Sequence, residues 1–542
     1  MKKIIECVPN FSEGRDEKII NAIADAIKNT KGVTLLDVDP GKSTNRTVYT
    51  FVGDNYSIVE GALNATRVAR KLIDMRSHKG EHPRMGALDV CPFVPVANVT
   101  MEECVECSKE FARRASEELN IPFYLYEEAS NIGYRKHLPD IRSGEYEALP
   151  KRIVQPEWKP DFGPAEFIPE WGATVTGARF FLIAYNINIL GTAQQSHRIA
   201  LNLREAGRGE DQPGKLKEVK GIGWYVDEYN MSQVSMNLTN YKVTPVHIAF
   251  EEVKNEAKLL NVAIAGSELV GLIPLEAILM AADYYIKKEN IMIVDERQKI
   301  RLVVERLGLN SISIFDPNKR IIEYIIDDKA QNEPLANLTL RNFIEEIANR
   351  TSAPGGGSAS AAIAAMGVAL GCMVGQLTYG IRKFENVDRE IRKPIPFLYE
   401  AVQNLIPMVD ADTNAFNDYM EALRMPKTTD EEKVIRTKAM QDGLKKAIEI
   451  PLKTMKYANN VWDSMIEVAR YGNIASKSDV EVGCRAMEMG IWGAYKNVLI
   501  NLEGIKDKEF VNNKIKEVEV IRDNSISKMK TVLNILEERS KK

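Results

Sequence analysis

Histidine and cysteine are scarce in this chain. It has five histidines and six cysteines among 542 residues. Six cysteines do not make a disulfide framework in so long a chain, and Cys104 and Cys107 have no second pair with which to bind zinc. The sequence therefore predicts a protein without a metal site, whose cysteines stay reduced as they do in the cytoplasm.

A large excess of charge and a long, strongly apolar run are also missing. The net charge of −4 gives no reason to expect nucleic acid or a membrane surface as a partner. The first residues, Met-Lys-Lys-Ile-Ile-Glu, lack the apolar region of a signal peptide. No charge occurs between Arg350 and Arg382, but Ala, Gly and Ser dominate that stretch. We expect a buried helix there rather than a membrane span.

The length predicts several domains, since one domain takes ~150 residues. Residues 1–177 show the order β-α-β-β-α-β, and residues 178–327 repeat it, beginning with a strand predicted over Ala178–Leu190. This order is typical of a ferredoxin-like α+β subdomain. A polar linker is expected at 328–337. Residues 338–542 contain helical patterns only, which predicts an all-α helical bundle.

Two of the five histidines lie in one polar segment, Ser77–Pro95. His78 and His82 are four residues apart, a metal-binding spacing on a helix, but Gly80 and Pro83 exclude a helix here. A loop with His, Lys, Glu and Arg beside a buried strand suits acid–base chemistry near pH 7. Either histidine could instead be structural. Asn45 and Arg46, which follow the turn at Asp39, are weaker candidates to hold a substrate carboxylate.

The segment Asp161–Gly172 combines aromatic, apolar and acidic residues with little regular structure. Such a loop suits a flat heteroaromatic ring with polar edges. The alternative is that Phe162, Phe167 and Trp171 only hold the two halves together, since such residues are often core.

Farther along, Asp412 falls on an apolar stripe with Val409 and Phe416. Burial raises the pKa of a carboxyl group, so Asp412 is suited to exchange protons near neutral pH. A structural ion pair or helix cap is the alternative. Asp410 lies off the stripe and is expected to face solvent or a cap, and Ser358 is a plausible helix N-cap after the Gly355–Gly357 run.

These motifs resemble two enzyme families. Gly-Glu-His-Pro-Arg-Met-Gly (80–86) and the loop 163–172 are similar to signatures of glutamate formimidoyltransferase. Pro-Gly-Gly-Gly-Ser-Ala (354–359), Val-Asp-Ala-Asp (409–412) and Gly-Asn-Ile-Ala-Ser-Lys-Ser-Asp (472–479) resemble formimidoyltetrahydrofolate cyclodeaminase. The chain as a whole resembles the bifunctional formimidoyltransferase-cyclodeaminase family.

The resemblance implies transfer of the formimino group from N-formimino-L-glutamate to tetrahydrofolate, followed by cyclodeamination to 5,10-methenyltetrahydrofolate and ammonia, as in histidine degradation. It implies His82 and Asp412 as the catalytic residues and no metal. It also implies tetrahydrofolate, as a polyglutamylated co-substrate, bound by a loop of ten residues: Gly163, Pro164, Ala165, Glu166, Phe167, Ile168, Pro169, Glu170, Trp171 and Gly172.

The family further implies a homo-oligomer, a ring-shaped octamer of dimers, in the cytoplasm. Two alternatives remain open at this point. One is a methenyltetrahydrofolate cyclohydrolase with a degenerate transferase half, and the other is a folate-binding scaffold without activity.

Overall fold

The computed structural model describes residues 3–80, 82–326 and 333–541. The chain forms two compact units. The first comprises Met1–Ile291 and Asp295–Asp327, and the second comprises Met292–Val294 and Asp328–Lys542. The linker expected at 328–337 lies partly outside the described residues.

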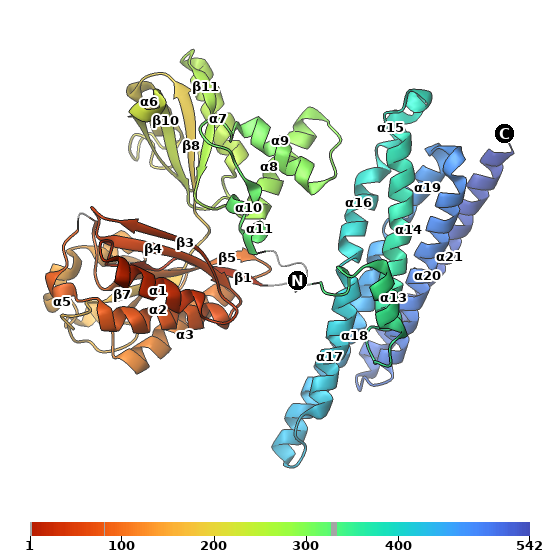
Figure 1. The fold of residues 1–542 in the computed structure, drawn as a ribbon, viewed down its shortest axis with the longest axis horizontal. Helices are drawn as coiled ribbons and strands as arrows, with labels where there is room; N and C mark the ends of the chain where they lie inside the picture. Colours follow the sequence, from red (N-terminus) through yellow and green to blue (C-terminus); the bar gives the residue numbers. More distant parts are fainter. Residues whose placement is uncertain (1–2, 81, 327–332, 542) are drawn as a thin grey trace. The chain divides into compact units, whose positions relative to one another are not determined.

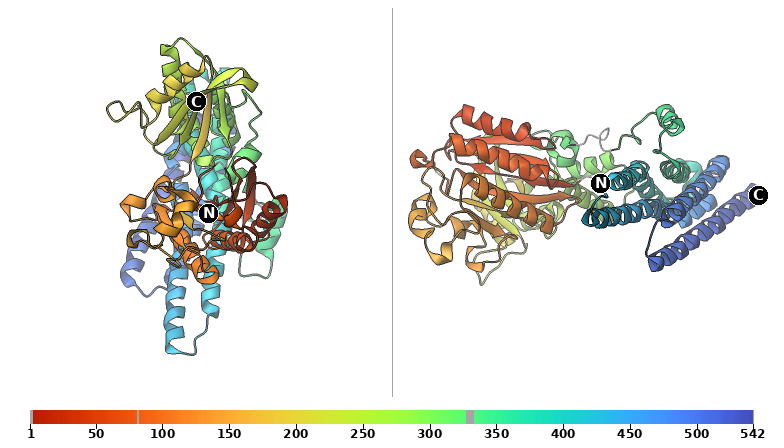
Figure 2. Two further views of the ribbon diagram at one scale, coloured as in Figure 1. Left: turned by 90° about the vertical axis from the view of Figure 1, so that its left-hand side faces the viewer. Right: turned by 90° about the horizontal axis from the view of Figure 1, so that it is seen from below.

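The first unit begins with a mixed sheet of seven strands in the order β1-β4-β2-β5-β7-β6, with β3 paired to β4. The strands are β1 (Ile4–Cys7), β2 (Asn10–Phe11), β3 (Thr34–Gly41), β4 (Arg46–Gly53), β5 (Leu88–Ala97), β6 (Phe123–Glu127) and β7 (Thr174–Ala178). Three helices, α1 (Glu17–Lys28), α2 (Ser57–Leu72) and α3 (Met101–Leu119), lie on one face of this sheet (Figures 1 and 2).

The core of this subdomain lies between the sheet and these helices. Ile5 and Cys7 on β1 point into it, together with Phe93 of β5 and Phe111 of α3. Because side chains alternate along a strand, Glu6 faces the opposite side of the sheet. The start of α3 is fixed by a capping box between Thr100 and Glu103, a signal that is present in the sequence itself.

The strand predicted over Ala178–Leu190 begins later than expected. It forms β8 (Ile183–Leu190), whereas Ala178 is the last residue of β7, and an irregular connection lies between them. β7 was missed, and it runs parallel to both β5 and β6. It therefore belongs to the first sheet, where it lies between these two strands.

Residues 134–153, where the helical pattern of the sequence predicts one helix, form two separate helices, α4 (Leu138–Arg142) and α5 (Glu145–Arg152). Gly144 between them has φ 77°, a left-handed conformation that ends a helix and that glycine adopts without strain. Short 3₁₀ turns complete the chain: Met75–Ser77, Gly133–Arg135, Pro156–Trp158, Asp227–Tyr229, Arg382–Val387 and Ile474–Ser476.

The second sheet of the first unit is antiparallel, in the order β11-β8-β10-β9. Its strands after β8 are β9 (Val219–Val226), β10 (Met231–Leu238) and β11 (Ala263–Val270). The crossing helices are α6 (Ala193–Leu203) and α7 (Val246–Leu259). The helices α8 (Leu275–Glu289), α9 (Glu296–Leu307), α10 (Pro317–Arg320) and α11 (Ile322–Ile326) follow (Figure 1).

The second unit is helical throughout its described part. Its helices are α13 (Leu340–Ala348), α14 (Gly356–Thr378), α15 (Asp388–Ile391), α16 (Pro394–Leu405), α17 (Met408–Arg424), α18 (Asp430–Asn459), α19 (Trp462–Tyr471), α20 (Lys477–Leu502) and α21 (Lys508–Ser540). α17 and α18 form an antiparallel pair that extends beyond the other helices of this unit (Figure 1).

Helices α14 and α20 pack closely because glycines face each other across them. A Cβ on Gly367 would lie 2.6 Å from the Met487 amide nitrogen, and one on Gly490 would lie 2.7 Å from that of Ala364. Among the described residues, α14 alone is long and apolar enough to cross a membrane, and 61% of its most apolar stretch is buried inside the fold. A buried helix was expected at this place.

Candidate functional site

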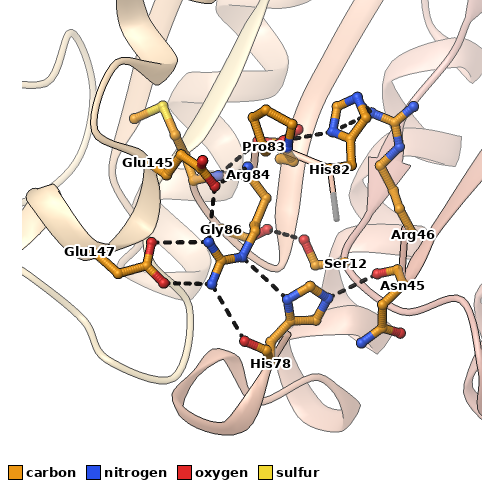
Figure 3. Close-up of polar contacts among 12 residues, drawn as sticks. Ser12, Asn45, Arg46, His78, His82, Pro83, Arg84, Gly86, Glu145 and Glu147 are labelled. Carbon is orange, nitrogen blue, oxygen red and sulfur yellow. Dashed lines mark hydrogen bonds and ion pairs between the residues drawn. The ribbon is translucent and has the colours of Figure 1, made fainter. Parts of the chain in front are cut away.

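His82 lies in the loop before β5, against the first residue of β4 (Figure 3). Two glycines of its motif fit only because they lack side chains. A Cβ on Gly80 would lie 2.1 Å from the Thr44 carbonyl oxygen, and one on Gly86 would lie 2.4 Å from that of Ala173. Ser12 also donates a hydrogen bond to the Gly86 carbonyl at 2.7 Å. The loop is thus fixed by backbone contacts on both sides of the histidine.

The hydrogen bonds of His82 define its tautomer. Nδ1 lies 2.7 Å from the Pro83 carbonyl oxygen, which can only accept, so Nδ1 carries the proton and Nε2 does not. Arg46 Nη1 lies 2.9 Å from Nε2 and 3.2 Å from Nδ1. In the plane of the imidazole ring, the lone pair of Nε2 and the N–H bond of Nδ1 point away from each other. An atom at similar distances from both nitrogens therefore lies above the face of the ring and not in its plane.

Burial lowers the pKa of His82 below its usual value, and the Arg46 guanidinium lowers it further. His82 is therefore a neutral base at neutral pH, with Nε2 unprotonated and not aligned with a single donor. This is the state that a general base needs before it accepts a proton.

The second histidine of the loop has a different environment. His78 Nε2 donates to the Asn45 carbonyl at 2.8 Å, and Nδ1 faces Arg84 Nε at 3.4 Å (Figure 3). Arg84 in turn forms ion pairs with Glu145 and Glu147 at 3.0 and 2.6 Å. Both nitrogens of His78 are engaged by the protein, so its role is structural.

A cavity of ≈ 1110 Å³ within the first unit lies beside this loop, and residues next to both sheets line it. Arg46 lines it, together with Arg142 from the end of α4 and Arg179 after β7. The wall also includes acidic side chains, among them Glu127 and Glu218. The cavity thus offers cationic groups for an anionic ligand close to His82.

Glu6 was not singled out from the sequence. Its side chain is 5% exposed, on the sheet face opposite to the core. Burial raises the pKa of Glu6 to about 7, while Arg179 opposes that rise. The sequence Ile-Ile-Glu-Cys does not reveal that Glu6 is buried, because a polar residue on an alternating strand can face solvent as readily as a buried site.

The loop 163–172 lies within the first subdomain and does not join two halves. Trp171 is fully buried in its core, and Trp171 Nε1 donates to Thr174 Oγ1 at 3.1 Å. Phe167 packs on Tyr146 with ring centroids 5.4 Å apart. Trp171 is thus a core residue of the first subdomain, and it does not hold the two halves together. The loop adjoins the histidine segment, because Gly172 pairs with Gly86.

Asp412 lies on α17, facing α14 and α20. Asn497 Nδ2 on α20 donates to Asp412 Oδ1 at 3.0 Å. Ser358 is inside α14 and is not its N-cap, which is Gly355. Ser358 Oγ donates its proton to the Val409 carbonyl at 2.7 Å and lies 3.4 Å from Asp412 Oδ2. Burial raises the pKa of Asp412, and the contacts with Ser358 and Asn497 oppose the rise.

A protonated Asp412 can donate to the Ser358 oxygen, and an ionised one can accept from Asn497. Both protonation states thus find a partner, as a residue that takes up and releases a proton requires.

Asp410 is not at the surface, contrary to the sequence prediction. It is 4% exposed and accepts hydrogen bonds from the Leu335 and Ala336 amides at 2.8 and 3.0 Å. The partner segment lies more than 70 residues away in sequence, so helix periodicity could not reveal it. Asp410 anchors the chain before α13, and Asp412 remains the carboxylate with side-chain partners on neighbouring helices.

Three family models match successive parts of the chain. They are described as the N-terminal subdomain of the formiminotransferase domain (residues 4–179), the formiminotransferase domain (184–327) and formiminotransferase-cyclodeaminase (339–520). A formimidoyltransferase-cyclodeaminase of Dictyostelium discoideum is 61% identical over 540 residues, which is 99% of this chain and 100% of that protein.

The chain belongs to the formimidoyltransferase-cyclodeaminase family. Relatives of each half also exist separately. A glutamate formimidoyltransferase of Streptococcus pyogenes serotype M1 is 41% identical and covers 54% of this chain and 95% of its own. A methenyltetrahydrofolate cyclohydrolase of Methylorubrum extorquens is 34% identical and covers 34% of this chain and 88% of its own. The family's two domain types correspond to the two units, each with one of the sites described above.

The described residues contain no group of three or more His, Cys, Asp or Glu side chains arranged to bind a metal ion. All six cysteines are unpaired and buried. The candidate acid–base groups described above are His82, in the first unit, and Asp412, in the second.

Proposed function

We propose that this protein transfers the formimino group of N-formimino-L-glutamate to tetrahydrofolate at His82, and then closes and deaminates the product at Asp412. The observation that carries the proposal is the neutral His82, whose Nδ1 proton is fixed by Pro83 and whose Nε2 is ready to accept a proton. The full-length relative from Dictyostelium, which bears the name of both activities, supports it.

In the first step N5 of tetrahydrofolate attacks the amidine carbon of the substrate. His82 Nε2 takes the proton that N5 loses, and returns it to the glutamate nitrogen as the old carbon–nitrogen bond breaks. One base thus serves both halves of the exchange, with no net change in its protonation.

In the second step N10 attacks the same carbon. The Asp412 carboxylate accepts the N10 proton and passes it to the nitrogen that leaves as ammonia. A carboxyl group with a raised pKa suits this transfer, because its acid and base forms are closer in free energy near neutral pH.

An absorbance assay for 5,10-methenyltetrahydrofolate tests the proposal. Wild type mixed with formiminoglutamate and tetrahydrofolate should form it. His82→Ala should form neither product nor intermediate, and Asp412→Ala should release glutamate and stop. Turnover of formiminoglutamate by His82→Ala at the wild-type rate would overturn the role of His82.

A second candidate is a methenyltetrahydrofolate cyclohydrolase with an inactive first unit, as the name of the Methylorubrum relative suggests. Supplied methenyltetrahydrofolate separates the two. Hydrolysis of this compound, without any reaction of formiminoglutamate, would establish the cyclohydrolase and contradict our proposal.

The remaining expectations are part of the same proposal. Loop 163–172 would bind tetrahydrofolate, with its polyglutamate tail, next to the histidine loop. The antiparallel order β11-β8-β10-β9 supports a ferredoxin-like fold for the second subdomain, whereas β7 modifies that fold in the first. Unpaired cysteines support a cytoplasmic location.

A homo-oligomer, up to an octamer, is supported by exposed apolar side chains on two helices. They are Met366, Met373 and Leu377 on α14 and Val482, Met489 and Trp492 on α20, each at least 36% exposed. A second copy of the chain would cover such rows. Light scattering of the purified protein should give a mass several times that of one chain, and a monomer would contradict this part.

A further inference from the structure

Arg46 is a guanidinium in contact with the His82 ring. It is the first residue of β4, it is half-buried, and it forms no direct ion pair with any acidic side chain of the described residues. Burial lowers the pKa of Arg46 and Arg142 lowers it further, while the charges of Asp89 and Asp39 oppose that fall. An unpaired, partly buried guanidinium is costly, so a fold that keeps one has a use for it in binding an anion.

Arg142, at the end of α4, is a second guanidinium that lines the same cavity as Arg46. It donates through Nη2 to Asp89 Oδ2, and Asp89 is fully buried and also accepts from the Met85 amide at 2.9 Å. Arg142 Nε is buried without a hydrogen-bond partner. Arg46 and Arg142 both line the ≈ 1110 Å³ cavity. Arg142 is paired with Asp89, so Arg46 is the guanidinium of the two that has no carboxylate in direct contact.

The reaction places a carboxylate at this point. In formiminoglutamate the nitrogen that leaves is bonded to the α-carbon, which also carries the α-carboxylate. The group that returns a proton to that nitrogen must therefore lie within a few ångströms of the carboxylate. The glutamate tail of folate is separated from N5 by the aminobenzoyl spacer and cannot meet this condition as directly.

We propose that Arg46 and Arg142 form a two-guanidinium clamp for the α-carboxylate of the amino-acid substrate, against the face of the His82 ring. This inference rests on the proposed transfer reaction. A bidentate arginine fixes the plane of a carboxylate as well as its position. The clamp thus orients the leaving nitrogen toward His82 Nε2.

The clamp also couples substrate binding to the basicity of His82. The charged groups that act on its ring are Arg46 from β4, Arg142 from α4 and Asp89 from β5. A bound carboxylate neutralises part of the positive charge that opposes the imidazolium. The pKa of His82 therefore rises when the substrate binds, and the proton that N5 gives up is accepted more readily.

Steady-state kinetics test the clamp with three variants. Arg46→Gln and Arg142→Gln should raise KM for formiminoglutamate about tenfold or more, since each loses a charge-assisted contact, and should leave KM for tetrahydrofolate within about twofold. Arg46→Lys keeps the charge but not the planar fork, so it should be intermediate. Arg113→Lys, on the exposed face of α3, is the matched control. Thermal unfolding confirms that each variant folds.

The outcome also identifies the source of the carboxylate. A rise in KM for tetrahydrofolate alone would overturn the proposal and assign the clamp to the folate tail. Calorimetry with L-glutamate provides a second measurement, in which wild type should bind it and Arg46→Gln should bind about tenfold more weakly. Glutamate binding that depends on Arg46 in a protein that fails to turn over formiminoglutamate would overturn the proposed function and leave the clamp standing.

A pH titration of the proton NMR signal of the His82 ring shows whether Arg46 acts on His82 or has only a structural role. Saturating L-glutamate should move the midpoint of its titration to higher pH in wild type. In Arg46→Gln the midpoint should be higher without ligand and should shift less with it. An unchanged midpoint in both would overturn the coupling.

Discussion

Asn497 Nδ2 and Asp412 Oδ1 lie 3.0 Å apart, although the two residues are 85 positions apart in sequence and belong to different helices. The space between them is closed by the backbone of Gly357, where a Cβ would lie 2.1 Å from both atoms. The helix therefore allows the contact only because this position has no side chain.

We predict that Gly357→Ala abolishes deamination without affecting transfer. The added methyl group must displace the Asp412 carboxylate, and a shift of about 1 Å at a catalytic group can cost about 100-fold in rate. Gly356→Ala is the matched control, since a Cβ there meets nothing within 4 Å. Separate assays of glutamate release and of ammonia measure the two steps. Equal loss in both variants would show that the helix, and not the contact, is responsible.

The deamination step should decline with acid at a pH above the ordinary carboxyl value of 3.8. Burial raises the pKa of Asp412, so its base form is lost sooner as pH falls. Asn497→Ala removes a hydrogen bond to the ionised form and should move this decline to still higher pH. Asn414→Ala, on the exposed side of α17, should not. A pH profile of ammonia release tests this, and a decline that stays in place in Asn497→Ala would contradict it.

Transfer should also decline with acid, but the pKa of its base is shifted down where that of Asp412 is shifted up. Burial and Arg46 lower the pKa of His82 from 6.5, so the neutral base of the free enzyme persists to lower pH than for an exposed histidine. The value of kcat/KM for glutamate release, which reports the free enzyme, should therefore fall with a midpoint below pH 6.5. A profile with its midpoint above 6.5 would show that His82 is not the group that limits transfer.

Glu6 should make the first unit less stable as pH rises. In the folded protein the pKa of Glu6 is about 7, above the ordinary value of 4.5. The stability that protonated Glu6 contributes to the fold is therefore fully present below pH 4.5 and is lost as pH rises through 7. A shift of that size corresponds to roughly 3 kcal/mol. Glu6→Gln should lose less stability than wild type between pH 5 and 8 in thermal unfolding, and Glu157→Gln, at the surface, should behave as wild type. Parallel curves for wild type and Glu6→Gln would refute this.

In loop 163–172, substitution of a buried residue should lower the stability of the protein, whereas substitution of an exposed residue should weaken only the binding of folate. Trp171→Ala should cost about 3–5 kcal/mol of stability, because its ring is fully buried. Glu166 is exposed, so Glu166→Ala should leave the unfolding temperature unchanged and raise KM for tetrahydrofolate if the loop binds folate. An unaltered KM would remove Glu166 from that site.

Some parts of this fold could be predicted from the sequence because their signals are local. Helix α3 has a capping box at Thr100 and Glu103, and its start follows from those residues alone. β7 could not be predicted in the same way, because its place between β5 and β6 depends on parallel pairing with strands about 50 and 85 residues away.

The candidate site shows the same limit. His82 was accessible to sequence reasoning because a rare residue lies in a distinctive loop. Arg142, whose charge acts on His82, was not accessible in this way, because it lies on α4, about 60 residues farther along the chain. Asp410 and Asp412 are two residues apart on one helix, yet one anchors a distant backbone segment and the other lies against Ser358 and Asn497. Only the neighbouring elements distinguish them.

The glycine contacts between α14 and α20 determine which part of the second site can adjust. Ser358 stands on α14 and Asn497 on α20, and Gly367 and Gly490 leave no gap through which these helices could slide. The donor side of the site is therefore a fixed template. These glycine contacts do not include α17, which carries Asp412 and whose far end extends with α18 beyond the neighbouring helices, so we expect ligands of different shape to be accommodated by α17 (Figure 1).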